Sequence, residues 1–367
     1  MSNHSISASE QTKMPISLAG RNVGKGCPVF ITFEAGPTHD GLESAKALTR
    51  VAAEAGADAI KFQIIDAERL VADPSIEISY GVLEERETEI TATKSEPLID
   101  ILKRRMLSWD EWREVKAEAD ASGIAFFATV GFEDEVDFVS EIGAHSIKIA
   151  SADINHHSLI EYAAKTGLCI QLDTGHATIG EVEAAVDLIR RCDNEDIVIH
   201  HCPTGYPARL EGINLQIIPT LRKMFDYPIA FSDHTSGWEM DVAAVALGAN
   251  MIEKTLTEDR MTASVEHIMS LEPHDAQKFV RSMHELETAL GTSRRVMNEE
   301  ERQKRLANRR SLYTSRDIAE GSVLAENDIV HRRPGYGIPV VDTKAYIGRR
   351  LARSVKAGQA LSPQDFA

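Results

Sequence analysis

Short apolar runs alternate with longer amphipathic stretches from residue 29 onward. Eight runs have the length and β-branched character of buried strands: Val29–Ala35, Asp58–Ile64, Ala125–Val130, Ser146–Ser151, Cys169–Thr174, Ile197–Cys202, Ile229–His234 and Met251–Leu256. Helical periodicity fills most of the intervals, at residues 41–55, 109–121, 180–191, 213–225, 239–247 and 275–290. Strands that are buried on both faces and separated by helices indicate a parallel sheet. Eight such units predict an α/β fold, a (β/α)8 TIM barrel over residues 27–292.

The segments outside this alternation predict the rest of the domain organisation. Residues 1–26 start with a Ser-rich polar stretch that lacks the apolar core of a secretory signal, so we predict an N-terminal tail. Residues 67–102 are acidic and weakly periodic, and they follow the second strand, where barrel enzymes place substrate-covering loops. The charged stretch 293–310 is predicted to be a linker.

The last segment, residues 311–367, contains an internal repeat. Residues 318–329 and 355–366 share the pattern apolar-x-x-Gly-x-x-Leu-x-x-x-Asp-apolar. Two copies are too few for a solenoid, so the repeat predicts a small β-rich domain with pseudo-symmetry.

Composition narrows the function classes. The formal net charge of −17 argues against nucleic acid and anionic membranes as partners, because both require a cationic surface. No apolar run approaches the roughly 18 residues that span a bilayer. The four cysteines are scattered without a CxxC pair, which favours reduced thiols and a cytoplasmic location.

Polar residues collect where the predicted strands end. In a barrel these ends meet at one mouth, so their side chains converge. The strand ends carry Glu34, Lys61, Gln63, Thr129, Lys148, Ser151, Asp173, His200, His201, Ser232, Asp233, His234, Glu253, Lys254 and Thr255. This convergence predicts an enzyme.

The residue types in this ring indicate an anionic substrate. Lys61 and Lys148 supply positive charge, and hydroxyl and amide groups supply donors for phosphate oxygens. A Schiff-base pyruvate aldolase is an alternative, because a lysine inside a barrel can attack a carbonyl group. His234 is placed for a divalent metal ion that Asp173, His176 or Glu253 could also bind.

Several motifs resemble the sialic acid (nonulosonic acid) synthase family, whose barrel is followed by an antifreeze-like (SAF) domain. They are residues 33–41 (FEAGPTHDG), 61–63 (KFQ), 148–151 (KIAS), 173–175 (DTG), 201–202 (HC), 206–207 (YP), 232–235 (SDHT), 253–254 (EK) and 333–337 (RPGYG). The resemblance covers nearly the whole chain.

The resemblance implies condensation of phosphoenolpyruvate with an N-acylated hexosamine such as N-acetylmannosamine. Glu34, Lys61, Lys148 and Glu253 match catalytic positions, and Gln63, Thr129, Ser151, Asp173, Thr204, Tyr206 and Ser232 match substrate-binding positions. Arg333 matches an arginine that reaches the partner's acceptor sugar in a domain-swapped homodimer.

Two departures concern the metal ion that the resemblance implies. The family binds Mn²⁺ or Mg²⁺ with the histidine of the Ser-Asp-His motif and with a second histidine, at whose position this chain has Thr255. Asp173 stands where the family has serine. We therefore expect a weakened site, or one rebuilt from Asp173 and His176 around His234. A catalytically altered binding homologue is a further alternative.

Overall fold

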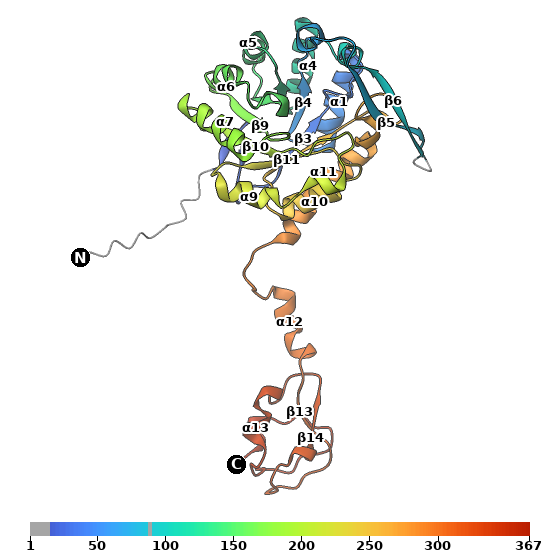
Figure 1. Cartoon of the computed structure of the whole chain (residues 1–367). Coiled ribbons are helices and arrows are strands. Elements are labelled where there is room, and N and C mark those ends of the chain that lie inside the picture. The colour runs from blue at the N-terminus through green and yellow to red at the C-terminus, as the bar shows by residue number, and fades with distance from the viewer. Residues whose placement is uncertain (1–14, 87–89) are drawn as a thin grey trace, which may run out of the picture. The chain divides into compact units, whose positions relative to one another are not determined.

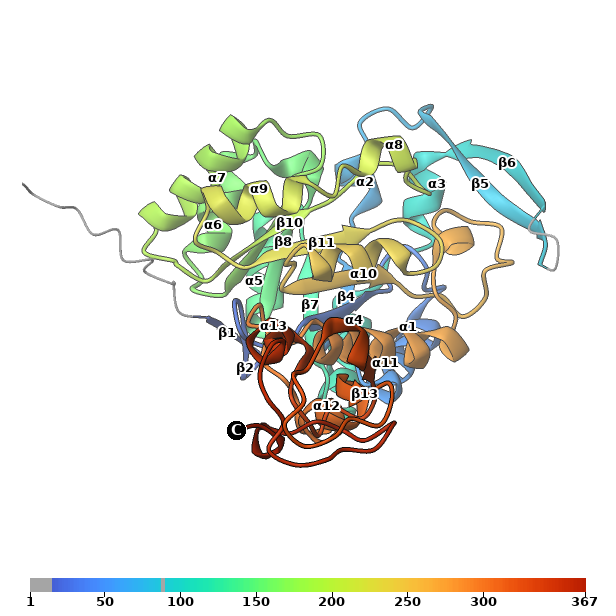
Figure 2. The same cartoon turned by 90° about the horizontal axis from the view of Figure 1, so that it is seen from below.

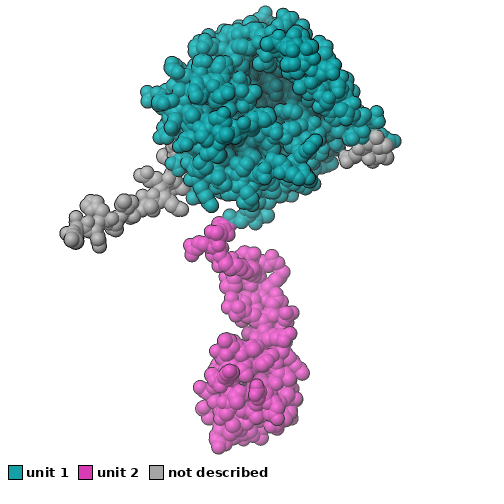
Figure 3. All heavy atoms as spheres, viewed as in Figure 1, with its two compact units in different colours: residues 1–291 teal, residues 292–367 magenta. Residues whose placement is uncertain are grey.

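The computed structural model describes residues 15–86 and 90–367. The chain divides into two compact units, which meet in sequence between Gly291 and Thr292 (Figure 3). None of the helices in the described ranges has both the length and the apolar character needed to cross a membrane.

The first unit is a closed barrel of eight parallel strands, as predicted (Figure 1). In chain order the strands are β3 (Phe30–Glu34), β4 (Ala59–Gln63), β7 (Ala125–Thr129), β8 (Ser146–Ile149), β9 (Cys169–Asp173), β10 (Ile197–His201), β11 (Ile229–Asp233) and β12 (Met251–Thr255). The barrel closes where β12 pairs with β3.

Helices follow the strands and surround the barrel (Figures 1 and 2). They are α1 (Leu42–Ala55), α4 (Trp109–Ala121), α5 (Glu133–Glu141), α6 (His157–Ala164), α7 (Ile179–Arg191), α9 (Ile217–Met224), α10 (Glu239–Ala246) and α11 (Pro273–Leu290), with α8 (Leu210–Ile213) as a short addition. Their starts are encoded locally. Ser108 and Thr178 cap α4 and α7 through reciprocal hydrogen bonds with Glu111 and Glu181.

Alternate strand residues fill the barrel interior, since side chains along a strand point to opposite faces. The amino-terminal ends of the strands contribute an apolar layer that includes Phe30, Phe127 and Met251. A hairpin of β1 (Ile16–Leu18) and β2 (Arg21–Val23) packs against this layer. The hairpin therefore closes the end of the barrel opposite the carboxyl ends of the strands.

The prediction of a tail through residue 26 is wrong for residues 16–23. Three-residue strands are too short to show alternation in the sequence. The connecting residues Ala19 and Gly20 both have positive φ, 50° and 77°, as a two-residue hairpin turn requires.

The described residues of the insertion after β4 form helices and strands rather than an irregular loop. It contains α2 (Ala67–Leu70), the antiparallel strands β5 (Glu77–Glu85) and β6 (Ile90–Pro97), and α3 (Leu98–Lys103). The hairpin projects at the edge of the unit beside α3 (Figure 2). Tyr80 and Val82 of β5 form a small core with Ile101 of α3.

The second unit contains α12 (Glu299–Asn308), β13 (Ser311–Thr314), β14 (Ile329–Arg332) and α13 (Thr343–Tyr346). Its repeat halves meet at equivalent positions, because Ile318 and Val355 exchange two backbone hydrogen bonds of 2.9 Å. The repeated aspartates, Asp328 and Asp365, are buried and pair with Arg316 and Arg353. The pattern read from the sequence thus corresponds to a structural pseudo-repeat.

Candidate active site

The four residues predicted to be catalytic lie together inside the barrel and are buried. Nζ of Lys148 is 2.6 Å from Oε1 of Glu253, and Nζ of Lys61 is 3.3 Å from the same oxygen. Lys61 also pairs with Glu34. The two ammonium groups therefore share one carboxylate at the centre of the barrel.

Other predicted substrate contacts surround this pair of lysines. Asp173 Oδ1 lies 3.0 Å from Nζ of Lys148, and Ser232 Oγ lies 3.1 Å from it. Thr129 Oγ1 is 3.3 Å from Nζ of Lys61. The set offers cations, hydroxyl groups and carboxylates within one water-poor space.

Two glycines allow the loops above the strands to approach Gln63 and Ser151. A Cβ atom at Gly36 would lie 2.6 Å from Cγ of Gln63, and one at Gly175 would lie 2.6 Å from Oγ of Ser151. Any larger residue at either position would displace these side chains from the site.

The ion pairs set the charge states of the central groups. Burial alone would raise the pKa of Glu253, but Lys148 and Lys61 outweigh it and hold this pKa far below its usual range. Burial opposes the charge on Lys148, yet Asp173 and Glu253 raise the pKa of this lysine above its usual value. Burial raises the pKa of Asp173, with Lys148 acting in the opposite direction. Glu253 and Lys148 are therefore charged at neutral pH.

Glu266 is a site residue that the sequence analysis missed. It lies in the long loop after β12 and is buried. Burial and the nearby charge of Glu34 raise the pKa of Glu266 to about 8, so this carboxyl group is largely neutral at pH 7. Glu266 also raises the pKa of the Tyr206 hydroxyl, and its effect is larger than the effect of burial. In the sequence, the one indication of Glu266 as a site residue is its position in a loop rich in charged residues.

A buried series of hydrogen bonds from Gln171 through His200 holds Ser232 in place. Nε2 of His200 is 2.9 Å from Oε1 of Gln171, and Nδ1 of His200 is 3.0 Å from Ser232 Oγ. Burial and Lys148 lower the pKa of His200, so its ring is neutral. A polar Gln171 in the middle of a buried strand was the signal in the sequence. His201 points outward, to the carbonyl oxygen of Ile213 at 2.6 Å.

Two members of the predicted ring, Asp233 and Lys254, also point away from the site. They alternate with the inward-facing Ser232 and Glu253, so the period of the strand turns them toward α10. There Lys254 pairs with Asp233 and lies 3.5 Å from Asp241. The three ionisable groups form a buried cluster between the barrel wall and α10.

Tyr206 and His234 border the mouth. Their rings are 5.0 Å apart in an edge-to-face arrangement, and Nδ1 of His234 donates to the carbonyl oxygen of Pro203 at 2.9 Å. Thr204 and His176 are exposed. Arg333 lies in the second unit.

The predicted metal site is not formed. Within residues 15–86 and 90–367, no three His, Cys, Asp or Glu side chains come together as a metal-binding group. Asp173 and Glu253 face Lys148 instead of His234, and His176 faces solvent. Lys148 pairs with Asp173 and with Oε1 of Glu253, while Oε2 of Glu253 is buried without a hydrogen-bond partner among the described residues. Because these carboxylates do not converge with His234 or His176, the residues do not fit the expected divalent ion.

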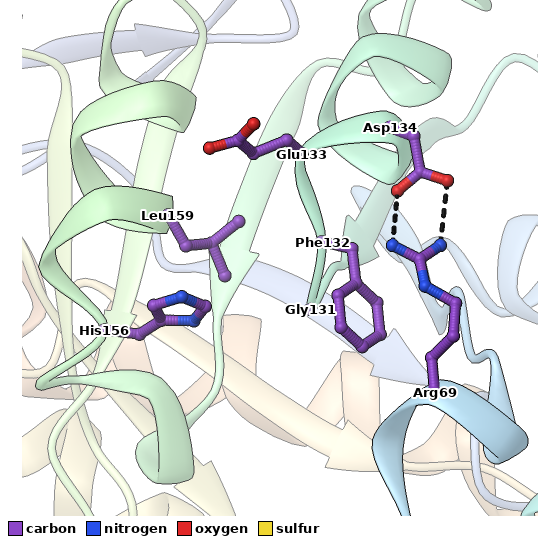
Figure 4. Close-up of a pocket in the computed structure, with 7 residues that line it drawn as sticks. All are labelled: Arg69, Gly131, Phe132, Glu133, Asp134, His156 and Leu159. Carbon is purple, nitrogen blue, oxygen red and sulfur yellow. Dashed lines mark hydrogen bonds and ion pairs between the residues drawn. The ribbon is translucent and has the colours of Figure 1, made fainter.

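A pocket of about 430 Å³ lies beside the mouth, among the loops after β4, β7 and β8 (Figure 4). Arg69 projects into it and forms two hydrogen bonds, of 2.8 and 2.9 Å, with Asp134. Its guanidinium carbon is 3.8 Å from the ring centroid of Phe132. The cation in this pocket is therefore already neutralised.

Comparisons with known proteins agree with this geometry. Residues 48–295 match the NeuB family, and residues 309–367 match the SAF domain. The chain is 31% identical to N,N'-diacetyllegionaminic acid synthase of Legionella pneumophila, over 92% of this chain and 94% of that protein. It is 30% identical to human N-acetylneuraminate-9-phosphate synthase, over 94% and 95%. The crystal structure of N-acetylneuraminic acid synthetase from Leptospira borgpetersenii superposes with a TM-score of 0.69 at 31% identity, covering 79% of this chain and 94% of that chain.

Proposed function

The chain belongs to the NeuB family, and from this premise we propose that it condenses phosphoenolpyruvate with the open-chain aldehyde of an N-acylated hexosamine. The products are a nonulosonic acid and inorganic phosphate. One observation supports this most directly: Lys61 and Lys148 lie side by side in the barrel, where a small substrate with a phosphate and a carboxylate group could bind both.

In the proposed reaction, C3 of phosphoenolpyruvate attacks the aldehyde carbon, and the aldehyde oxygen takes up a proton. Water then adds at C2, and the tetrahedral intermediate loses phosphate by cleavage of its C–O bond. Lys61, Lys148 and Ser232 stabilise the charge that develops on this intermediate. Glu34 and Glu266, whose carboxyl pKa values burial raises, can carry the protons.

Binding of the substrate has to change the partners of Lys148. This lysine is held by both Asp173 and Glu253, and a third anion beside them would be repelled. Asp173 is the group that can yield, because burial already favours its neutral form. We therefore propose that Asp173 binds phosphoenolpyruvate as a protonated acid that donates a hydrogen bond.

The same geometry disfavours the Schiff-base alternative. A lysine that forms a Schiff base must lose its proton, whereas the ion pair with Glu253, which remains when Asp173 is neutral, favours the charged form of Lys148. Borohydride in the presence of pyruvate should consequently leave Lys148 unmodified.

The test measures phosphate release from phosphoenolpyruvate with a panel of N-acylated hexosamines, each with EDTA and with Mn²⁺ added back. Release with one or more sugars that disappears in Lys148→Met is the expected result. Release that persists in EDTA would agree with the absence of a metal-binding group among the described residues. If the wild-type chain binds both substrates and releases no phosphate, it is a binding homologue and the proposal fails.

We further propose a cytosolic, domain-swapped homodimer in which Arg333 reaches the partner's acceptor sugar. Charge supports this arrangement, because residues 1–291 carry a formal charge of −23 and residues 292–367 carry +6. Mixing Lys148→Met chains with Arg333→Ala chains provides a test. In a swapped dimer, mixed pairs contain one intact site and regain activity. No recovery after subunit exchange would contradict the swap.

A further inference from the structure

A series of four buried polar side chains lies inside the barrel next to Lys148. They come from neighbouring strands and none is more than 1% exposed: Ser146 of β8, Gln171 of β9, His200 of β10 and Ser232 of β11. Because these side chains are shielded from water, each of their protons has to face a neighbouring protein group. The direction of the hydrogen bonds along the series is therefore fixed by its two ends.

The series begins at a backbone acceptor. Ser146 Oγ lies 2.8 Å from the carbonyl oxygen of Cys169, the usual length of an O–H···O hydrogen bond, so Ser146 donates there. A hydroxyl group has one proton, so Ser146 can only accept from Gln171, whose Nε2 is 3.0 Å away. The amide group of Gln171 thus turns its oxygen toward His200.

His200 continues the series in the same direction. Its Nε2 lies 2.9 Å from Oε1 of Gln171, and since this oxygen cannot donate, Nε2 carries the ring proton. The ring is neutral because burial and Lys148 lower the pKa of His200, and its Nδ1 is consequently an acceptor. The Ser232 hydroxyl, 3.0 Å from that nitrogen, donates its proton to it.

The reverse direction of the series fits the distances less well. In that direction Ser232 would donate to Oε1 of Glu253, and a hydroxyl group that donates to a carboxylate lies about 2.5–2.7 Å from it. The observed separation is 3.2 Å. The carbonyl oxygen of Cys169 would also lose the Ser146 hydroxyl as its donor. The distances at both ends therefore favour donation from Ser232 to His200.

This direction leaves Ser232 as an acceptor toward Lys148. Nζ of Lys148 has three N–H bonds and three neighbours, Glu253 at 2.6 Å, Asp173 at 3.0 Å and Ser232 at 3.1 Å. Glu253 and Ser232 hold two of these bonds. The third points to Asp173, the group proposed to yield to phosphoenolpyruvate. The direction in which Lys148 meets the substrate therefore depends on the oxygen of Ser232.

We propose that His200 is a positioning residue for the condensation: it takes the Ser232 proton, so that Ser232 directs Lys148 toward phosphoenolpyruvate instead of donating to the substrate. This inference rests on the proposed function, since it assigns a role in the same site. Ser232 then acts on the developing charge through Lys148. Gln171 sets the tautomer of His200 on which the arrangement depends.

Nuclear magnetic resonance of the full-length chain tests the direction of the hydrogen bonds. In protein that carries isotope-labelled histidine, ring nitrogens with and without a proton have well-separated chemical shifts, and the signals of His200 are those lost in His200→Asn. We expect the proton on Nε2, with and without phosphoenolpyruvate. A proton on Nδ1, or a mixture of the two tautomers, would overturn the proposal whether or not the chain is a synthase.

A double-mutant cycle tests the role in the site, with phosphate release from phosphoenolpyruvate as the signal. His200→Leu removes the acceptor and should lower kcat/KM for phosphoenolpyruvate by about tenfold, as the loss of one buried hydrogen bond does. His200→Asn offers Oδ1 close to the place of Nδ1 and should restore most of this loss. In a Ser232→Ala background, His200→Leu should have less than about a twofold effect, because His200 acts through Ser232.

His201→Leu is the matched control. It makes the same change at the next residue, whose ring bonds the Ile213 carbonyl oxygen outside the barrel, so its effect should add to that of Ser232→Ala. An equal effect of His200→Leu with and without the Ser232 hydroxyl would overturn the proposal, since His200 would then only stabilise the fold. Should His200→Leu fail to fold, combining it with Gln171→Met removes the unpaired amide, and this pair takes its place in the cycle.

Calorimetry separates failure of this inference from failure of the proposed function. If the wild-type chain releases no phosphate, the same variants are compared for binding of phosphoenolpyruvate. Losses of affinity that are coupled between His200 and Ser232 support the positioning role although the proposed function fails. Additive losses, or no binding to the wild-type chain, overturn the positioning role as well.

Discussion

Replacement of Lys254 by methionine should destabilise the barrel strongly without altering its chemistry. Lys254 is 1% exposed, pairs with Asp233, lies 3.5 Å from Asp241 and donates to the Thr235 carbonyl oxygen at 2.7 Å. Lys254→Met leaves the carboxylate of Asp233 buried without a cation. Breaking a buried ion pair in this way costs about 3–5 kcal/mol of unfolding free energy.

Asp241→Asn should lower the free energy of unfolding much less than Lys254→Met does, by at most about 1 kcal/mol. Neither oxygen of Asp241 has a hydrogen-bond partner, and burial raises its pKa well above the usual value. Lys254 would keep Asp233 and the Thr235 carbonyl as partners. The exposed lysine of α9 gives the matched control, since Lys223→Met makes the same chemical change at the surface.

Tryptophan fluorescence during urea unfolding is the appropriate assay. All three tryptophans, Trp109, Trp112 and Trp238, lie in the first unit, so the signal reports the barrel and not the C-terminal unit. Equal losses of stability in Lys254→Met and Asp241→Asn would refute the reasoning. So would a Lys254→Met protein that keeps wild-type stability but releases no phosphate, because Lys254 would then act in the site.

Three further predictions concern the site and the closed end of the barrel. Glu253→Gln should lower kcat for phosphate release by about 10²–10⁴, measured at saturating substrates, because both lysines lose their shared carboxylate. The carboxyl group of Glu266 keeps its proton up to about pH 8 in the folded chain, whereas in the unfolded chain it loses the proton near pH 4.5. The free energy of unfolding should therefore fall as the pH rises from 4.5 to 8. The free energy of unfolding of Glu266→Gln, measured with urea, should therefore increase relative to that of the wild type as the pH rises. A difference that does not change with pH would contradict the assigned pKa. Leu18→Ala should cost about 2–4 kcal/mol in the same assay, since its side chain is buried against the barrel, whereas a free tail would show no loss.

The sequence predicted the barrel because its signal is repeated eight times. Each strand is a continuous apolar run bounded by a helix, and errors at one boundary do not alter the count. The β1–β2 hairpin escaped detection because two three-residue strands carry almost no periodicity. The β5–β6 hairpin escaped because charged residues on its exposed face mask the alternation.

The site was partly predictable for a related reason. Strand ends meet at one mouth, so Lys61, Lys148 and Glu253 could be grouped from their positions alone. Adjacent strand residues point to opposite faces, and the sequence does not show which of the two faces inward. The structure places His200 and Ser232 inside the barrel and turns their neighbours His201 and Asp233 outward. Glu266 lies on a loop, where position along the chain says little about position in space.

The closed end of the barrel has a practical consequence for handling the protein. Because β1 and β2 seal the face opposite the reactive residues, residue 15 enters the fold on the side away from the mouth. A surface anchor or fluorescent label joined ahead of that residue would leave the mouth open to small molecules. The same seal leaves the carboxyl ends of the strands as the open face, so we expect phosphate to depart on the side from which the sugar arrives, and a slowly leaving product would delay the next turnover.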